Sequence, residues 1–269
     1  MLIARKNRSL NRLIYLGLIK SGLQGAFVRV NLRQASAVPG SNRPVILYGN
    51  HSSWWDGHLG MAVNEERWHL DGYVMMEDKQ LQRYSFFRSV GAFSLNRSDT
   101  RSAMHTLDYA AELMTQSPGR MLMLFPQGEI LGNDVRPLAF FNGIAHLVKK
   151  IVERVGQCAL YPMALRYEFI GEQKPEAFIS IGEPLQLVRE SLPTPIKHLT
   201  GQMEVRLTQE LDRLHRDVTM YQFTTFEACI SGGWSLNRWW DAIRGRAPMA
   251  QVGREEYSPA APKQTIDDK

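Results

Sequence analysis

Residues 45–57, VILYGNHSSWWDG, contain a strand signal, a turn signal and the start of a helix in direct succession. The first four residues, 45–48, are an apolar, β-prone run, which is typical of a buried strand. A Gly–Asn pair then turns the chain, so we expect His51 to lie at the mouth of the helix that follows. Asp56 comes five residues later, one helical turn plus a loop step, so its carboxylate is able to fold back to the imidazole.

This pairing of residue types indicates acid–base chemistry. A neutral imidazole is a usable base near pH 7, and a carboxylate on its other ring nitrogen fixes the tautomer and stabilises the imidazolium. We therefore interpret His51 as a general base and Asp56 as its orienting acid. The spacing alone is weak evidence, because a turn in which an aspartate accepts a local hydrogen bond has the same pattern.

Two other kinds of site fit the sequence less well. His58 and His69 also follow His51, but no carboxylate-rich cluster and no zinc-ligand spacing completes a metal site. We expect no metal and no cofactor. A hydrolase-type nucleophile is disfavoured as well, since the sequence has no Gly-x-Ser-x-Gly elbow.

Short apolar runs alternate with helical patterns along the rest of the chain. Six runs bounded by Gly, Pro or polar residues are expected to be buried strands: 45–48, 73–76, 93–95, 121–125, 160–165 and 178–181. Between them, Ser98 or Thr100 is expected to cap a helix that stops at Pro118, and a second helix is expected over 141–155. Strands that alternate with helices predict an α/β fold with a largely parallel central sheet flanked by helices.

The two ends of the chain differ from this central part. Apolar residues recur every three or four positions over 199–218, which predicts an amphipathic C-terminal helix. Trp234, Trp239 and Trp240 follow it, either as a membrane-boundary cluster or as a cap on the domain. We divide the chain into a basic amphipathic segment (1–35), the α/β domain (36–190), a C-terminal helical part (191–249) and a disordered tail (250–269).

Positive charge is concentrated in the N-terminal segment. The net charge is +5, yet the residues before Asp56 carry eight basic and no acidic side chains, so they sum to +8 and the remainder to −3. Such a patch indicates a polyanionic partner, either membrane headgroups or nucleic acid. Aliphatic residues are interleaved with the cations: Leu10, Leu13, Ile14, Leu16, Leu18, Ile19, Leu23 and Phe27.

This interleaving favours a helix that lies in a membrane interface and argues against nucleic acid, since a stacking surface of aromatic and basic residues is also missing. An ordinary helix packed on the domain is the alternative, because core packing also produces amphipathicity. Lys20 interrupts the longest apolar stretch, so a membrane-spanning helix is not expected. We expect a peripheral protein on the cytoplasmic face of a membrane. Cys158 and Cys229 are interpreted as reduced thiols.

Three further segments accompany the histidine motif. GAFSLNR (91–97) ends in Arg97 just before a helix start, where a guanidinium is well placed to clasp a phosphate, although a solvated arginine is the alternative. In LFPQGEI (124–130) a strand ends, and Pro126 and then Gly128 follow it. Backbone N–H groups exposed around Gly128 could face an anion or an oxyanion. LYPMAL (160–165) is a strand with a proline near its start.

Taken in this order over about residues 45–185, the four segments resemble the four blocks of the glycerolipid (PlsC-like, 1-acylglycerol-3-phosphate) acyltransferase family. Asn50, His51 and Asp56 match its catalytic Asn-His-x4-Asp block without a gap, and Arg97 matches the acceptor-binding arginine of its second block. The third block departs from the family pattern Phe-Pro-Glu-Gly-Thr-Arg. It reads Phe-Pro-Gln-Gly-Glu-Ile here, so Gln127 is neutral, Glu129 adds a negative charge, and Ile130 replaces a cation.

The resemblance implies an O-acyltransferase that moves a fatty-acyl group from acyl-CoA or acyl-carrier protein to a hydroxyl of a lysophospholipid or another lipid. It places catalysis on His51 and Asp56 and substrate binding on Asn50, Arg97 and the Gln127–Gly128–Glu129 turn. The altered third block makes a simple lysophosphatidate acceptor less favourable unless a neighbouring arginine such as Arg136 compensates for the lost charge. A family member with altered catalysis that binds lipid at a membrane is the alternative.

Overall fold

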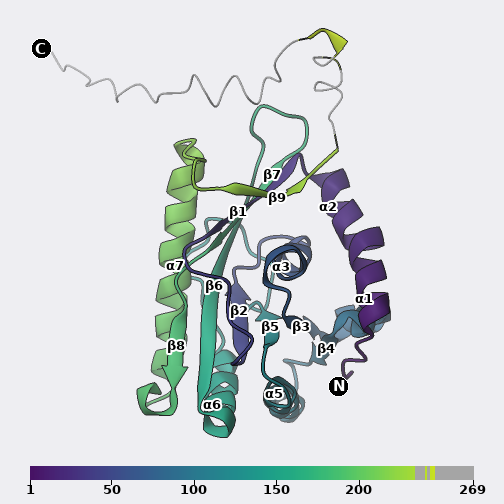
Figure 1. The fold of residues 1–269 in the computed structure, drawn as a ribbon. Helices are drawn as coiled ribbons and strands as arrows, with labels where there is room; N and C mark the ends of the chain where they lie inside the picture. Colours follow the sequence, from purple (N-terminus) through teal and green to yellow (C-terminus); the bar gives the residue numbers. More distant parts are fainter. Residues whose placement is uncertain (234–239, 241–242, 246–269) are drawn as a thin grey trace, which may run out of the picture.

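A computed structural model of the protein describes residues 1–233, 240 and 243–245. Within these residues nine strands form one sheet, in the order β4-β3-β5-β2-β6-β7-β1-β9, with β8 paired to β6 (Figure 1). The strands are β1 (Arg29–Gln34), β2 (Val45–Gly49), β3 (Asp71–Glu77), β4 (Ala92–Leu95), β5 (Arg120–Leu124), β6 (Gln157–Glu168), β7 (Glu176–Ile181), β8 (Leu185–Val188) and β9 (Glu227–Ser231).

Helices connect most of these strands. The α-helices are α1 (Arg8–Ile14), α2 (Ser21–Ala26), α3 (Asp56–Val63), α4 (Asp78–Arg83), α5 (Thr100–Thr115), α6 (Gly143–Val155) and α7 (Lys197–Thr219). Shorter helical turns are η1 (Tyr15–Lys20), η2 (Asn64–Trp68), η3 (Ser85–Val90) and η4 (Arg189–Ser191).

Five successive strands of the sheet, β4, β3, β5, β2 and β6, run parallel to one another. Beyond them β7 is antiparallel to β6, β1 is parallel to β7, and β9 is antiparallel to β1. The expected α/β fold with a largely parallel central sheet flanked by helices is therefore confirmed.

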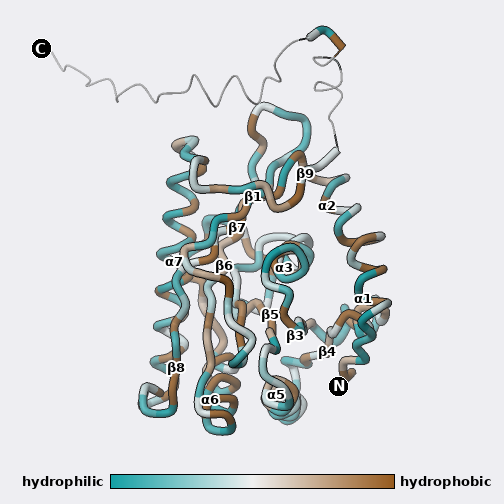
Figure 2. The backbone as a smooth tube through the Cα atoms, viewed as in Figure 1, coloured by the Kyte–Doolittle hydropathy of each residue, from teal (hydrophilic) through white to brown (hydrophobic). Residues whose placement is uncertain are grey.

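The sheet is covered on both faces because successive side chains of a strand point to opposite sides. In β2, all of whose residues are buried, Ile46 and Tyr48 pack in the cluster that contains α5, α6 and α7, whereas Val45 and Leu47 pack with η1, α2 and α3. Figure 2 shows hydrophobic stretches along the central strands, while α7 carries both hydrophobic and hydrophilic residues. Burial on both faces explains why the central strands are continuous apolar runs.

Several elements differ from the sequence-based expectation. Neither Ser98 nor Thr100 caps α5; the N-cap is Asp99, whose side chain accepts a hydrogen bond from the Arg101 amide. The strands β1, β8 and β9 were not expected, and β1 lies inside the segment 1–35 that we assigned to the membrane interface. These three strands are short or mix apolar with polar residues, so the sequence carries no clear strand signal. Each pairs with a strand that lies far away in the sequence or antiparallel to it.

Other expectations lie outside the described residues. The tail 250–269 is among these, together with Trp234 and Trp239. The domain limits themselves stay a prediction.

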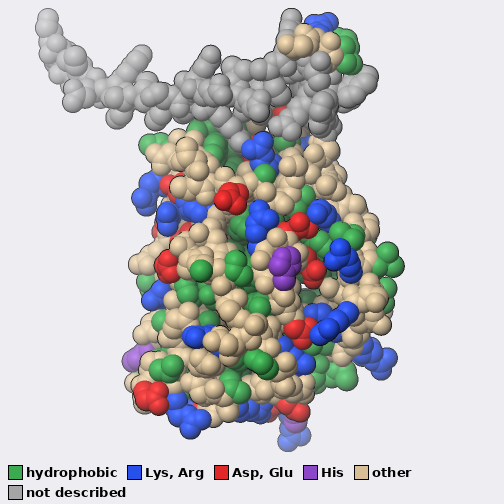
Figure 3. All heavy atoms as spheres, in the orientation of Figure 1, with side chains coloured by type: hydrophobic (Ala, Val, Ile, Leu, Met, Phe, Trp, Pro, Cys, Tyr) green, Lys and Arg blue, Asp and Glu red, His purple; other side chains and the backbone are tan. Residues whose placement is uncertain are grey.

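The N-terminal helical segment, α1 through α2, has two apolar faces. Tyr15, Ile19 and Leu23 are buried against the sheet. Leu10, Leu13, Leu16 and Leu18 point outward and are 41–68% exposed. Over α1 and α2, at the right of Figure 3, hydrophobic side chains project beside basic ones. The segment thus packs on the domain and also presents an apolar, basic surface. No helix in the described part of the chain has both the length and the apolar character needed to span a bilayer.

Candidate active site

The histidine and the aspartate of the first motif meet at the carboxyl end of β2. β2 ends at Gly49, the chain turns, and α3 begins at Asp56. Nδ1 of His51 lies 2.7 Å from Oδ2 of Asp56. Because Nδ1 is bound by the carboxylate, Nε2 is the ring nitrogen that remains for a substrate.

Asp56 is fully buried and surrounded by hydrogen-bond donors. Its Oδ2 accepts hydrogen bonds from the amides of Ser52 (2.6 Å) and Ser53 (2.9 Å) as well as from His51. Its Oδ1 accepts a short hydrogen bond from the hydroxyl of Tyr167. The positive end of the α3 dipole further stabilises this buried negative charge. The turn and the helix therefore hold a carboxylate that would otherwise be costly to bury.

Tyr167 is a site residue that sequence reasoning missed. It lies on β6, and its ring stacks on Phe27 at 5.7 Å. Burial, and then the charge of Asp56, raise the pKa of Tyr167 well above its usual value, so the phenol stays protonated and donates. The run expected to form this strand ended at residue 165, whereas β6 continues to Glu168. Extending the run past Arg166 to the β-prone Tyr167 would have placed Tyr167 on the sheet.

The main chain of His51 is fixed by the loop that follows β5. Oε1 of Gln127 accepts a hydrogen bond from the His51 amide (2.8 Å), and the Leu131 amide donates to the His51 carbonyl (2.8 Å). The imidazole stacks on Phe125 with 4.6 Å between ring centroids. Gln127 is buried, does not line the cavity and contacts the main chain of His51, while its expected contact with substrate stays a prediction. A neutral amide oxygen is sufficient for the contact with His51.

A cavity of about 510 Å³ opens beside His51. Its walls are mainly apolar, formed by residues of β3, β5, α3, α5 and α6 that include Met61, Met75, Met76, Met123, Leu107 and Ile144. Polar side chains reach it from the carboxyl ends of neighbouring parallel strands, where ligands bind in open α/β sheets. They include Arg97 after β4, Glu77 at the end of β3 and Glu129 after β5. Four expected site residues, His51, Arg97, Gly128 and Glu129, thus line one cavity.

The guanidinium of Arg97 packs against Gly128, in the loop that follows β5. The φ of Gly128 is 75°, a left-handed conformation that favours glycine, and a Cβ at this position would lie 2.0 Å from Nη1 of Arg97. Arg97 also lies over the ring of Phe141, with 5.5 Å between the guanidinium carbon and the centroid. The Gly128 amide donates a hydrogen bond to the Phe125 carbonyl (3.0 Å), so this N–H group is already paired within the turn.

Asn50 has a different environment from the one expected for a substrate-binding residue. Its side chain is buried, donates to the Leu165 carbonyl (3.0 Å) and accepts from the Leu165 amide (2.8 Å). This pair of hydrogen bonds ties the end of β2 to β6. Asn50 does not line the cavity, so its place is to hold the turn that carries His51.

His58 lies in the cavity wall among aromatic rings. Its ring centroid is 5.8 Å from that of Trp54 and 6.1 Å from that of Phe87. Burial lowers the pKa of His58, which favours the neutral imidazole. In the part of the chain that the structure describes, no three His, Cys, Asp or Glu side chains are grouped to hold a metal ion.

Comparison with known proteins places this site in a family. No curated protein matches the chain. Among solved structures it is similar to the 1-acyl-sn-glycerophosphate acyltransferase PlsC from Thermotoga maritima, with 15% sequence identity, a TM-score of 0.47, and 78% of this chain and 83% of that chain covered. The acyltransferase family model matches residues 29–166, just over half of the chain, and this region includes the His51–Asp56 pair and the residues from Arg97 to Glu129. The chain belongs to the acyltransferase family.

Proposed function

We propose that this acyltransferase transfers a fatty-acyl group from a thioester to a hydroxyl of a lipid acceptor, with His51 as general base and Asp56 as the residue that orients it. One observation carries the proposal: the 2.7 Å contact between His51 and Asp56 at the wall of a largely apolar cavity. An apolar cavity is suited to an acyl chain, and the adjoining base is suited to a hydroxyl group.

The proposed reaction needs no covalent intermediate. The acceptor hydroxyl gives its proton to Nε2 of His51 while its oxygen forms a bond to the thioester carbonyl carbon. When the resulting tetrahedral intermediate collapses, the carbon–sulfur bond breaks and the thiolate takes the proton from His51. A positioned base of this kind contributes about 10²–10⁴-fold to the rate.

Substrate roles follow from the residues of the cavity. Acyl-CoA or acyl-carrier protein is the proposed donor, and Arg97 and Glu129 are proposed to contact the acceptor. The outward apolar face of α1 and η1, with its neighbouring basic residues, supports peripheral attachment to the cytoplasmic face of a membrane. There the acceptor and the product would partition.

The alternative, a lipid-binding module with altered catalysis, is less well supported. A module that only binds lipid has no need of a buried carboxylate with hydrogen bonds from two amides, a phenol and an imidazole. Retaining this costly arrangement is explained by catalysis.

The test is the His51→Ala variant. We expect its acyl transfer to fall about 10²-fold or more, because the acceptor hydroxyl loses its base. Thioester consumption and acylated product are measured with purified protein and a panel of hydroxylated lipids. The matched control is His198→Ala, which removes an exposed histidine on α7 and should leave turnover unchanged. Wild-type turnover in a folded His51→Ala protein, judged by circular dichroism, would refute the assignment.

A further inference from the structure

From the charges at the cavity we infer that the acceptor carries an uncharged, hydroxyl-rich headgroup, as in a monoacylglycerol or a glycolipid, and no phosphomonoester. This inference rests on the proposed function, since it concerns the acceptor of that reaction. It depends on three charged side chains that line the cavity, Glu77, Arg97 and Glu129.

Strand order brings these charges together. Along the sheet, β4, β3, β5 and β2 are successive neighbours. Arg97 follows β4, Glu77 ends β3 and is paired with Leu95, Glu129 follows β5, and His51 follows β2. The strands that carry the two carboxylates therefore lie between the strand that precedes Arg97 and the strand that precedes His51, and all four side chains line one cavity. A headgroup whose hydroxyl reaches His51 is therefore held in a cavity lined by both carboxylates.

The balance of charge at the cavity is negative. Among the described residues that line it, Arg97 is the sole lysine or arginine, whereas two glutamates, Glu77 and Glu129, line it as well. A phosphomonoester carries close to two negative charges at neutral pH, so one guanidinium does not offset both the phosphate and the carboxylates. Ionised carboxylates instead accept hydrogen bonds from hydroxyl groups, which gives a polyol headgroup favourable partners.

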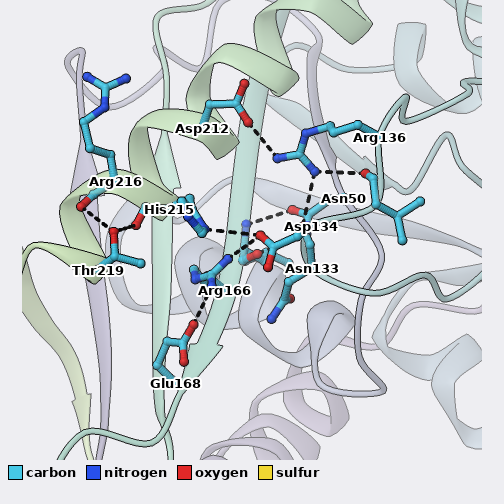
Figure 4. Close-up of polar contacts among 12 residues, drawn as sticks. Asn50, Asn133, Asp134, Arg136, Arg166, Glu168, Asp212, His215, Arg216 and Thr219 are labelled. Carbon is cyan, nitrogen blue, oxygen red and sulfur yellow. Dashed lines mark hydrogen bonds and ion pairs between the residues drawn. The ribbon is translucent and has the colours of Figure 1, made fainter. Parts of the chain in front are cut away.

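Arg136, which would be able to compensate for Glu129, points elsewhere. Its guanidinium contacts Asp212 of α7 at 2.9 Å and the carbonyls of Asn133 and Val135 (Figure 4). It is not part of the cavity wall.

The loop around Arg136 is also anchored in this orientation. Asp134 binds Arg166 at 2.7 Å and lies 3.3 Å from His215 of α7. These contacts turn the cationic part of the loop toward α7 and leave Glu129 and Ile130 at the cavity.

The experiment compares acceptors that differ only in the phosphate. Purified full-length protein is given acyl-CoA, and in parallel acyl-carrier protein, with 1-oleoylglycerol or 1-oleoyl-lysophosphatidate in neutral detergent micelles. We expect kcat/KM to be about tenfold or more higher for the monoacylglycerol, a difference of about 1.4 kcal/mol. An alkyl glucoside serves as a second neutral acceptor.

The double variant Glu129→Gln with Ile130→Arg tests whether the charge at the cavity sets the choice of acceptor. Ile130 is 56% exposed at the cavity, so an arginine there has room to reach an acceptor headgroup. We expect the preference to shift about tenfold or more toward lysophosphatidate, and the shift to shrink at high salt because exposed charges are screened. Glu77→Gln provides a second, milder variant in case the double variant folds poorly.

A matched control variant changes the net charge of the protein by the same amount, at residues that do not line the cavity. Glu190→Gln with Val188→Arg alters exposed residues of η4 and β8, and β8 pairs with the opposite, amino-terminal end of β6. This control should leave the acceptor ratio unchanged. Equal or better use of lysophosphatidate by the wild type, or an unchanged ratio in both cavity variants, would overturn the inference. Absence of transfer to every hydroxylated lipid would overturn the proposed function instead.

Discussion

At the scale of single residues, the orientation of His51 depends on the buried carboxylate of Asp56. Three of its four donors, the amides of Ser52 and Ser53 and the imidazole of His51, belong to the turn that precedes α3. The fourth, the hydroxyl of Tyr167, comes from β6, 111 residues away in the sequence. The orientation of the carboxylate toward His51 is therefore determined partly by local structure and partly by the packing of the sheet.

Tyr167→Phe tests this positioning role. Losing one charge-assisted hydrogen bond, worth roughly 1.5–3 kcal/mol, should lower kcat/KM about tenfold or more. Because the lost contact orients the base and does not bind substrate, we expect the loss in kcat, with KM close to the wild-type value.

A second tyrosine provides the matched control for that variant. The hydroxyl of Tyr73 donates to Oδ2 of Asp71 (3.1 Å) at the start of β3, so Tyr73→Phe removes a similar hydrogen bond away from the dyad. It should change thermal stability without lowering kcat. A folded Tyr167→Phe protein with wild-type kcat would show that this phenol does not position Asp56.

At the scale of secondary-structure elements, the N-terminal helical segment packs one apolar face on the sheet and exposes another to solvent. Ile19 and Leu23 are fully buried against the sheet, whereas Leu13 and Leu16 are 68% and 46% exposed. Deleting the segment would therefore uncover the core as well as remove the proposed membrane contact. Substitutions limited to the outward face separate these two effects.

Leu13→Glu with Leu16→Glu should weaken liposome binding about tenfold or more. Each buried leucine contributes about 1.5–3 kcal/mol, and added negative charge is repelled by anionic lipid. Binding is measured by sedimentation with anionic and neutral vesicles. The control, Val205→Glu with Met220→Glu, alters two exposed apolar residues at and just beyond α7 and should not affect binding. Equal sedimentation of both proteins would rule out this face as the membrane contact.

At the scale of the whole molecule, the two cysteines distinguish local opening of the sheet edge from global unfolding. Cys158 is fully buried in the central strand β6, and burial raises its pKa to about 12; Cys229 lies in the edge strand β9, where burial raises its pKa to about 11. Because the thiolate is the reactive form and must also be reachable, native protein should resist alkylation at both sites.

We expect Cys229 to react first as denaturant is added, through local opening of the sheet edge, and Cys158 only with global unfolding. Mass spectrometry after iodoacetamide treatment at increasing urea measures the order. Rapid labelling of Cys158 in native protein would contradict the packing of β6 described above.

Sequence alone determined the parts of this protein that depend on neighbouring residues. The apolar runs and helical periodicities predicted the fold class, because burial on one or two faces leaves a repeating pattern in the chain. The His51–Asp56 pair was also predictable, since both residues belong to one strand–turn–helix unit. The resemblance of the four motifs to glycerolipid acyltransferases led to the family, which the match over residues 29–166 confirmed.

Only the tertiary structure decided which distant polar groups meet. It paired Asn50 with Leu165, brought Tyr167 to Asp56, turned Arg136 toward α7, and placed β1 beside β7. No periodicity encodes these contacts, because they follow from the order of strands in the sheet. That order is selected by the packing of the whole core, and it brought His51, Glu77, Arg97 and Glu129 to one cavity.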